Sequence, residues 1–503
     1  MATLHSLPEH LVGQIYMLLP RDSQKAFYAS TKAVSTAPSI LHHHFSKLII
    51  SLKGKATINP LLTLPSKATL RHLVFDYSFS YGNPALPLSS IMLLPQFEEQ
   101  RSKVLALFRE VQVIEFKGSP DFKNEAAFQY MGQFLRTHAP SLHTIKLPKG
   151  GWPSAFLDAL TASDGGRNIR HLEMYDSRRE HLEALAKFRG LEFLRLSMAR
   201  DIGCLKSVFA PLCQLKKLSL FPLPPADVVA TLPASLETIS FDNPSFGQCL
   251  STDFCAVLVE LLSCACSGLL PALQRIHIPK LCFWTTTYPW VFERILQELI
   301  LCLSAATPAA VQVDEICFKG DPEEEQVSIH PMSWSICGVL TPSASKASFL
   351  GVRVTESDMA QLISHCPSVK DLQFGDACCY KGLSKCLSTV VEGLRFLERL
   401  DICYDPLWDP LEPSTYIPGS GLDVLSACAL LSPSRTCVLK VMLRLHTHCD
   451  EASVDAACHE LRSLHWAWDC IHRKLERMGG TSQQVVLESN LGELGHPSSE
   501  VSE

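Results

Sequence analysis

Residues 354–374 decide the fold and read VTESDMAQLISHCPSVKDLQF. The first half predicts a helix over 358–366, because apolar residues recur there at helical spacing: Met359, Leu362 and Ile363. In the second half Leu372 and Phe374 lie two residues apart, so both face one side of a short strand. Val369 covers the same core from the preceding turn. A helix and a strand within about 20 residues form one unit that cannot bury its apolar face alone.

The phrase that ends this segment recurs along most of the chain. It consists of an apolar residue, two variable residues, an apolar residue, one variable residue and a last apolar residue. The middle residues of the copies are Leu73, Ile114, Ile145, Leu172, Leu194, Leu218, Ile239, Ile276, Ile316, Val352, Leu372, Leu400 and Val441. Further helices are predicted between the copies, over 124–138, 180–188, 253–264 and 291–303. A strand and a helix repeating every 20 to 40 residues or so predict a solenoid; the alternative is an ordinary α/β domain with parallel strands.

These repeats resemble leucine-rich repeats. The pair Cys366-Pro367 between helix and strand resembles the join in the cysteine-containing type, and Thr137-His-Ala-Pro140 is a similar join without the cysteine. The resemblance implies an α/β solenoid with parallel strands on the concave face and helices on the convex face. We expect this solenoid over 51–445, a C-terminal helical cap over 446–480 and a disordered tail over 481–503.

Composition limits the class of protein. Of 503 residues, 47% are hydrophobic and 19% are charged, which is enough to bury a large core. The net charge of -6 argues against nucleic acid as the main partner, because phosphate binding needs a clustered positive excess. No run reaches the ~18 apolar residues of a membrane span, and the first residues lack a secretory pattern. We expect a protein of the cytoplasm, the nucleus or both, with no membrane partner, whose 20 cysteines are reduced and lie mostly in the core.

The first 50 residues predict three short helices. Ser6 and Glu9 have the spacing of a capping box, and Pro20 ends the first helix. One face of that helix is apolar and carries Leu11, Ile15, Leu18 and Leu19. A domain this small depends on a neighbouring domain or a partner. One interpretation is an N-terminal cap that covers the first core layer of the solenoid.

Residues 7–22, LPEHLVGQIYMLLPRD, resemble the opening of an F-box. That motif begins Leu-Pro-x-Glu, continues as an amphipathic helix with a central Ile and ends on Leu-Pro before an acidic residue. Ser30-Thr-Lys32 stands where the family has Ser-Lys or Cys-Lys, whereas Ser23 and the missing Trp after Lys32 depart from the family pattern. The resemblance implies a substrate-recognition subunit that docks on the Skp-type adaptor of a cullin ubiquitin ligase. The adaptor contacts that it implies are Leu7, Pro8, Leu11, Ile15, Leu19 and Ser30.

A protein substrate is expected to bind the repeats. Strand faces of solenoids are extended binding surfaces, so the variable residue between the last two apolar residues of each phrase is a natural contact. These residues are Glu115, Lys146, Glu173, Arg195, Ser219, Ser240, His277, Cys317, Gln373 and Asp401, and they form no stripe of one charge. Two insertions add aromatic residues, which either form an interface or fold back over the core. The expected substrate contacts are Trp284, Tyr288, Trp290, Tyr404, Trp408, Arg195 and His277.

No pattern indicates an enzyme or a cofactor. The sequence has no G-x-S-x-G, no phosphate-binding loop and no H-E-x-x-H. Residue types that bind zinc gather at His446, His448, Cys449, Cys458 and His459, although helical spacing places Cys458 on a core stripe. The competing function is a protein-interaction scaffold whose N-terminal helices only cap the solenoid.

Overall fold

The computed structural model describes residues 47–51, 70–76, 98–118, 125–147, 154–175, 179–197, 204–242, 248–284, 294, 297–302, 310–320, 328–329, 331–352, 354–375, 383–404, 438–443 and 485–489. The chain divides into two compact units. Unit 1 is Met1–Ile239 with Gly268–Leu273, and unit 2 is Ser240–Ser267 with Gln274–Glu503. The expected F-box-like helices and the expected cap over 446–480 lie outside the described residues.

Unit 1 alternates strands with helices. Its strands are β1 (Lys47–Ser51), β2 (His72–Asp76), β3 (Val113–Lys117), β4 (Thr144–Lys146), β5 (His171–Tyr175), β6 (Phe193–Ser197) and β7 (Lys217–Leu220). Its helices are α7 (Glu98–Glu110), α8 (Glu125–His138), α9 (Ser154–Thr161), a 3₁₀ helix (Ala162–Asn168), α10 (Arg179–Leu185), α11 (Leu205–Phe209) and α12 (Ala226–Val229). The first described strand, β1, starts at Lys47, before the predicted boundary at residue 51, and its run Leu48-Ile-Ile50 pairs in the ladder with β2.

Unit 2 continues the alternation, and β8 (Thr238–Phe241) crosses the boundary between the units. Its strands are β9 (Gln248–Cys249), β10 (Arg275–Trp284), β11 (Ala310–Lys319), β12 (Lys346–Leu350), β13 (Asp371–Phe374), β14 (Arg399–Tyr404), β15 (Val438–Leu443) and β16 (Val485–Ser489). Its helices are α13 (Thr252–Cys266), α15 (Pro331–Leu340), α16 (Glu356–His365) and α17 (Leu383–Gly393). The prediction of a disordered tail is wrong at β16, where Val485-Val-Leu487 forms a strand beside β15 that the polar composition around it concealed.

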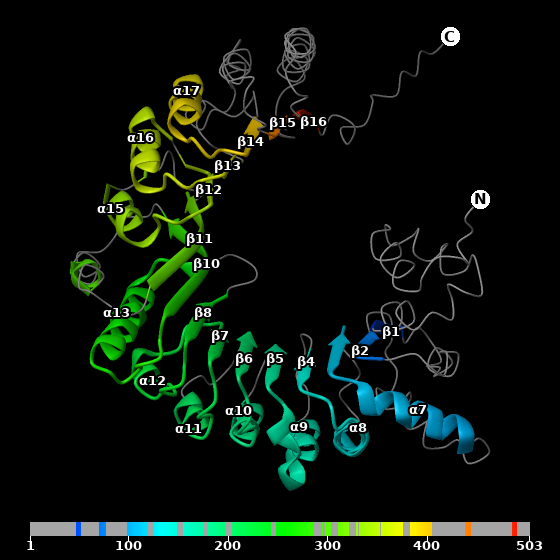
Figure 1. Cartoon of the computed structure of the whole chain (residues 1–503). Helices are drawn as coiled ribbons and strands as arrows, with labels where there is room; N and C mark the ends of the chain where they lie inside the picture. Colours follow the sequence, from blue (N-terminus) through cyan, green and yellow to red (C-terminus); the bar gives the residue numbers. More distant parts are fainter. Residues whose placement is uncertain are drawn as a thin grey trace, which may run out of the picture. The chain divides into compact units, whose positions relative to one another are not determined.

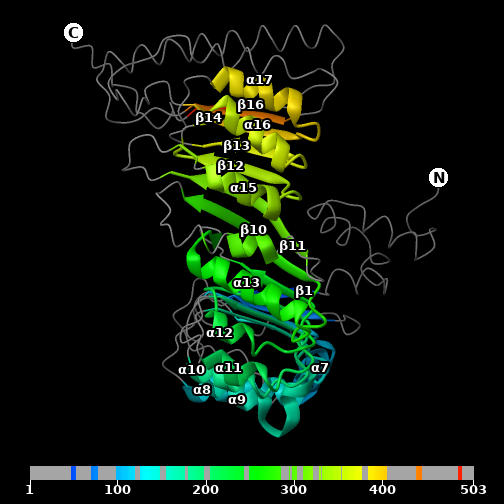
Figure 2. The ribbon, with the colours of Figure 1, turned by 90° about the vertical axis from the view of Figure 1, so that its left-hand side faces the viewer.

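The strand pairs that the structure describes are parallel. In unit 1 the strands follow the sequence from β1 to β7, and in unit 2 they follow it from β10 to β16, with β9 beside β10. A doubly wound sheet reverses its strand order at a switch point, whereas this ladder adds each repeat to the previous one. Within each unit the helices lie on one side of the strands (Figure 1), and Figure 2 shows α15, α16 and α17 stacked in the same order as the strands that they follow. The prediction of an α/β leucine-rich-repeat solenoid is confirmed.

The apolar residues of the phrases form the core. In β5, Leu172 and Met174 are buried, and Ile169 is buried in the turn before the strand. The same holds in the copies centred on Leu73, Ile114, Ile145, Leu194, Leu218, Ile239, Leu372 and Leu400. The predicted helices supply the other wall: α8 buries Phe128, Met131, Phe134 and Leu135. The spacing therefore identifies both layers of the repeat.

One turn recurs at the join between helix and strand. The N–H of Val369 donates to the carbonyl of Cys366, and the N–H of Cys366 donates to the carbonyl of Leu362. Ala139 makes the same two bonds, accepting from Leu142 and donating to Leu135. Cys366 and Ala139 are both buried, so the position selects a small apolar side chain and the cysteine is one solution among several.

The predicted phrase Phe349/Val352/Val354 is wrong. β12 ends at Leu350, and its core residues are Ala347 and Phe349, which pair with Leu372 and Phe374 of β13. Ala344 takes the first position of the phrase and is fully buried. Alanine hid this copy, because it is too small to stand out from a variable position, while the nearby Val352 and Val354 are buried outside the strand.

β10 and β11 are longer than the other strands and change phase together. In β10 the core residues are Ile276 and Ile278, then Leu281 and Phe283, so two outward residues follow each other at Pro279-Lys280. β11 does the same between Val313 and Ile316, in register with β10. As a result His277 pairs with Gln312, and Cys282 is the residue that pairs with Cys317. His277 and Cys317, the predicted outward residues of two successive phrases, therefore do not lie beside each other on neighbouring strands.

The prediction that the cysteines lie mostly in the core is confirmed for the described ones. None of the described cysteines is in a disulfide, and seven are buried: Cys255, Cys264, Cys282, Cys317, Cys337, Cys366 and Cys386. Burial raises the pKa of Cys255 to about 12, which keeps its thiol protonated and inert.

Candidate functional site

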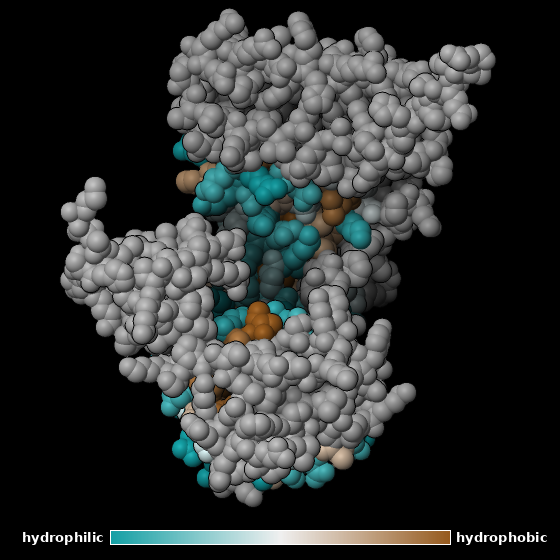
Figure 3. All heavy atoms as spheres, turned by 90° about the vertical axis from the view of Figure 1, so that its right-hand side faces the viewer, coloured by the Kyte–Doolittle hydropathy of each residue, from teal (hydrophilic) through white to brown (hydrophobic). Residues whose placement is uncertain are grey.

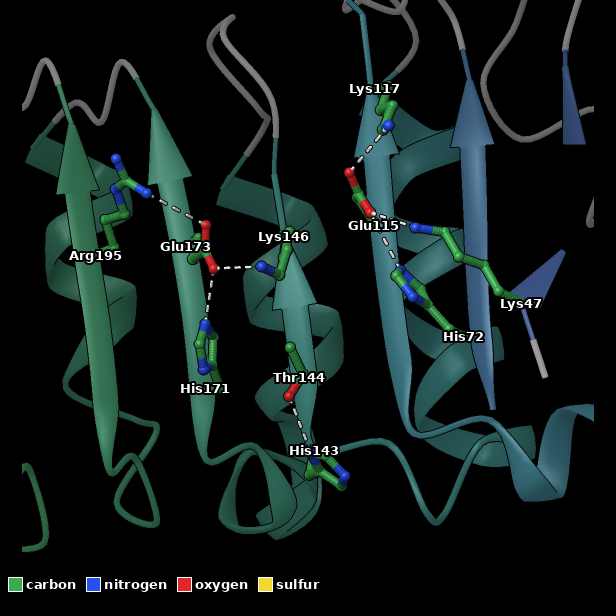
Figure 4. A network of polar contacts seen from close by, with 10 residues as sticks. All are labelled: Lys47, His72, Glu115, Lys117, His143, Thr144, Lys146, His171, Glu173 and Arg195. Atoms are coloured by element: carbon green, nitrogen blue, oxygen red, sulfur yellow. Dashed lines mark hydrogen bonds and ion pairs between the residues drawn. The ribbon is translucent and has the colours of Figure 1, made fainter. Parts of the chain in front are cut away.

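The candidate site lies on the strand face of unit 1 that the helices leave uncovered, which we call the open face. Since side chains alternate along a strand, every second residue points to this face while the phrase residues point to the core. The central residues of four neighbouring strands form one row in register: Glu115, Lys146, Glu173 and Arg195. We call these residues the charge row. Figure 4 shows their side chains standing on the same side of the ladder.

Glu173 is the centre of the charge row. Its carboxylate lies 2.6 Å from Lys146 Nζ, 2.8 Å from His171 Nε2 and 4.0 Å from Arg195 Nη1. Burial alone raises the pKa of Glu173, but hydrogen bonds from His171 and Lys146 and their positive charge bring that pKa down to about 2. Glu173 is therefore ionised throughout the physiological range and fixes the bases around it.

Glu115 gathers a second group of bases at the start of the row. Its carboxylate lies 3.2 Å from His72 Nε2, 3.5 Å from Lys117 Nζ and 3.9 Å from Lys47 Nζ. Burial lowers the pKa of His72, and the charge of Lys47 lowers it further, while Glu115 opposes both effects. Each carboxylate of the charge row thus forms ion pairs with several bases from its own strand and from neighbouring strands.

The bases of the open face stand further out than the acids. The side chain of Glu173 is 12% exposed, against 37% for Lys146. Glu115 is 21% exposed, whereas Lys47 and Lys117 are 45% and 46% exposed. Arg195 lies over the ring of Tyr175, 5.8 Å from its centroid, which fixes the guanidinium by a cation–π contact. An approaching molecule therefore meets fixed cations above recessed carboxylates.

Unit 2 carries a different polar arrangement on its strands. His277 joins Ser240 and Asp314, with Nδ1 3.2 Å from the Ser240 hydroxyl and Nε2 2.7 Å from the Asp314 carboxylate. The order of these groups is that of a hydrolytic triad, but the triad aspartate is buried. Here Asp314 is 44% exposed and also accepts from Gln312, so we interpret the three groups as a surface hydrogen-bond chain.

A thiol pair lies further along the same strands. Cys282, Cys317 and Ser348 are neighbours in register on β10, β11 and β12, and all three are buried. A hydrogen bond with Cys282 lowers the pKa of Cys317 to about 7, against the effect of burial, and Ser348 and Lys280 lower it further. Lys280 itself lies 2.5 Å from Glu315. Burial keeps this pair out of reach of a large partner.

Two of the predicted substrate contacts have described side chains. Arg195 belongs to the charge row, and His277 belongs to the hydrogen-bond chain of unit 2. Trp284 ends β10 and Tyr404 ends β14, where only the backbone is described. Outside the described residues lie Tyr288, Trp290, Trp408, the adaptor residues Leu7, Pro8, Leu11, Ile15, Leu19 and Ser30, and the zinc-ligand types His446, His448, Cys449, Cys458 and His459.

The sequence interpretation missed the bases that flank the row. His72, His171 and Lys217 face the open side, each two residues before the central position of its strand, and Lys117 follows Glu115 by two residues. The signal was available, because a period of two places residues on both sides of an outward residue on the same face. The sequence also shows that acidic and basic residues alternate along the charge row. Whether they form ion pairs depends on which strands are neighbours.

The described part of the chain shows no other candidate of this kind. Within it, no three His, Cys, Asp or Glu side chains are placed to share a metal ion, and none of its helices combines the length and apolar character that crossing a bilayer requires. The described residues that are visible in Figure 3 are mainly hydrophilic, with smaller hydrophobic areas among them.

Comparisons with known proteins do not identify a family. No family model matches the chain, and no curated protein is similar to it in sequence. Among solved structures the chain is similar to the crystal structure of a Rad7 and Elc1 complex in yeast, with a TM-score of 0.38 and 13% sequence identity. The match covers 75% of this chain and 86% of the yeast chain.

Proposed function

We propose that the chain is a protein-recognition scaffold, which binds another polypeptide through the open face of unit 1. The observation that carries this proposal is the charge row, whose four acidic and basic side chains are held at fixed spacing by parallel strands. Side chains that are already ordered lose little conformational freedom when a partner binds. Ion pairs between neighbouring strands supply that order, and the recessed carboxylates keep the bases directed outward.

We propose further that the scaffold is the substrate-recognition subunit of a Skp/cullin/F-box ubiquitin ligase, in the cytoplasm, the nucleus or both. This part is supported by the F-box-like sequence of residues 7–22 and by the position of that sequence before a leucine-rich-repeat solenoid. The competing scaffold function uses the same open face but requires no adaptor. The two differ in one measurable respect, which is binding of a Skp-type adaptor.

The adaptor part is tested with purified full-length chain and a Skp-type adaptor in a pull-down. The double variant Leu7→Ala/Pro8→Ala is expected to lose the adaptor, because both residues open the docking motif. Gln14→Ala changes a polar residue of the same predicted helix that is not among the implied adaptor contacts, and it serves as the matched control. The ligase proposal fails if the wild type does not bind or if the double variant binds as well as the control.

The recognition part is tested by affinity purification of the tagged chain from cells that express it. Lys146→Ala/Arg195→Ala removes both bases of the charge row, whereas Lys346→Ala/Arg399→Ala removes two bases of unit 2 strands. The first variant is expected to lose the recognised protein, which is the bound protein other than the adaptor. The second variant is expected to retain it. Equal recovery with both variants, each with an unchanged unfolding midpoint, contradicts recognition through this face.

A further inference from the structure

We infer that the ligand of the open face of unit 1 is an acidic protein segment, whose carboxylates bind Lys146 and Arg195. This inference rests on the proposed recognition function and specifies the chemistry of its partner. It is carried by three observations: the exposure of the bases, the charge balance of the face and the fixed acids between the bases.

The first observation is the difference in exposure between the two signs of charge. Glu173 and Glu115 form the floor of the face, and the bases that pair with them reach past them toward solvent. An ammonium group carries three N–H donors, and the pair with Glu173 occupies one donor of Lys146. The remaining donors can bind an incoming carboxylate without breaking the pair. Charge-assisted bonds of this kind are stronger than bonds between neutral groups.

The second observation is the charge balance of the face. The strands β1 to β7 direct five bases to the open side: Lys47, Lys117, Lys146, Arg195 and Lys217. They direct three acids there, Asp76, Glu115 and Glu173, so with neutral histidines the difference is 5 − 3 = +2. The whole chain has a net charge of -6, so this face opposes the average. A positive face attracts an acidic ligand and repels a basic one.

Unit 2 also carries both signs on its strands, but its acids are not uniformly recessed: Glu315 and Asp401 are less exposed than the bases that they bind, whereas Asp314 is not. There Asp314 is more exposed than its partner His277, and Asp371 is 37% exposed. An acidic segment approaching those strands meets carboxylates at the surface. Lys346 and Arg399 are suitable control positions because they are strand bases that also pair with acids, Asp371 and Asp401, but belong to unit 2 and not to the open face of unit 1.

The third observation is the position of the acids between the bases, which favours a peptide over nucleic acid. A nucleic acid carries a phosphate at every step, so Glu115 and Glu173 would repel it on two of the strands. A peptide can place carboxylates at the bases and neutral residues over the acids. Crossing β1 to β7 takes about 29 Å, which about nine extended residues span.

The test uses the full-length chain and fluorescence anisotropy with labelled peptides of 12 residues. One peptide alternates Glu and Ser, the other alternates Lys and Ser, and a single-stranded oligonucleotide is the third probe. The acidic peptide is expected to bind the wild type, to bind Lys146→Ala/Arg195→Ala at least 10-fold more weakly and to bind Lys346→Ala/Arg399→Ala within 2-fold of wild type. Raising the salt concentration is expected to weaken binding, because the contacts are ionic.

A second variant keeps the test independent of folding. Lys217→Glu changes an exposed base at the β7 end of the face and leaves Glu115 and Glu173 with their partners. It is expected to weaken the acidic peptide about 3-fold at low salt. Equal binding of the acidic peptide by all variants, stronger binding of the basic peptide, or stronger binding of the oligonucleotide overturns the inference.

The outcome also separates this inference from the proposed function. If no acidic peptide binds, while Lys146→Ala/Arg195→Ala still loses its bound protein in the affinity purification, recognition through the open face stands and the acidic ligand is wrong. If that variant retains its bound protein, the proposed function itself fails.

Discussion

Unit 1 and unit 2 build the same repeat with different side chains in the same positions. In unit 2 the last apolar position of the phrase is phenylalanine in β11, β12 and β13, and Phe283 of β10 lies in register with the first of them. The rings of Phe283, Phe318, Phe349 and Phe374 form a stack, with neighbouring centroids 5.1, 5.1 and 5.5 Å apart. In unit 1 that position changes after Phe75 and Phe116 to Met174, Leu196 and Leu220. The regular feature of the core, the phenylalanine stack, is in unit 2, whereas the regular feature of the open face, the charge row, is in unit 1. The backbone ladder therefore leaves core and surface free to vary separately along the chain.

The largest expected effect tests the aromatic core of unit 2. Phe318→Ala is expected to lower the free energy of unfolding by about 3–5 kcal/mol, because Phe318 is fully buried and stacks on Phe283, Phe349 and Trp334. Leu196→Ala, at the same phrase position in unit 1, is expected to lower it by about 2–4 kcal/mol. Urea denaturation followed by circular dichroism measures both. A smaller loss for Phe318→Ala than for Leu196→Ala would contradict the comparison.

The next effect concerns a close approach of backbones that both units contain. A Cβ on Gly320 would lie 1.9 Å from the carbonyl oxygen of Gly351, and one on Gly190 would lie 2.1 Å from that of Arg167. Gly320→Ala and Gly190→Ala are each expected to destabilise the protein by about 2–3 kcal/mol, because backbone must move. Gly268→Ala has no neighbour within 4 Å but carries a positive φ of 77°, so its smaller loss of about 1 kcal/mol measures conformational strain alone. Equal losses at the three sites would exclude the steric explanation.

Glu173 gives a pH-dependent effect that unit 2 is not expected to share. Because the pKa of Glu173 is lowered to about 2, its stabilising contribution is complete above the ordinary value of 4.5 and is lost as the pH falls from 4.5 toward 2. Glu173→Gln is expected to destabilise the protein by about 2 kcal/mol at pH 7. The difference from wild type should stay constant between pH 7 and pH 5 and narrow below pH 4.5, as measured by denaturation at each pH.

Asp401→Asn is the matched control for Glu173→Gln. Asp401 also lies on a strand and binds Arg399, but that arginine is half exposed and belongs to the same strand. A loss below about 1 kcal/mol is expected. If Asp401→Asn and Glu173→Gln cost the same at pH 7, the charge row has no special role in stability.

The smallest effect is expected on the helix side. Lys187 Nζ lies 2.5 Å from Asp158, but both side chains are half exposed and water competes for them. Asp158→Asn is expected to change the free energy of unfolding by at most about 0.5 kcal/mol. An effect as large as that of Glu173→Gln would mean that ion pairs on the two sides of the solenoid are equivalent, which our comparison denies.

Most of the fold could be predicted from the sequence because the phrase repeats. Large apolar residues such as Leu172 and Leu194 stand out against variable neighbours, and two of them at a spacing of two define the face of a strand. The pattern failed where Ala344 and Ala347 replaced large residues, and in α15, whose sequence PMSWSICGVL is too apolar all round to show a stripe. The pattern also did not predict the second halves of the long strands β10 and β11, because the alternation of inward and outward residues is interrupted in the middle of each strand.

Less of the candidate site could be predicted, for a different reason. Glu115, Lys146, Glu173 and Arg195 were correctly placed on the outward face, but their pairing requires the register of four strands. How far Glu115 and Glu173 lie below the surrounding bases depends on the lengths of the side chains and on His72 and His171. These two histidines stand two residues before the central outward position of their strands. The predicted aromatic contacts Tyr288, Trp290 and Trp408, and the adaptor contacts near Leu7 and Ile15, remain predictions.

The shared change of phase in β10 and β11 has a consequence for how this chain can diverge. Deleting Pro279 would restore strict alternation in β10, with Leu281 and Phe283 still directed to the core, but it would leave β11 with one residue more than β10 in this stretch and break the register between the two strands. A matching deletion at Asp314 would remove the extra residue of β11 and restore the register, so neither strand tolerates the change without the other. Inheritance is therefore expected to keep or lose the two irregularities as a linked pair, even where the residues around them drift.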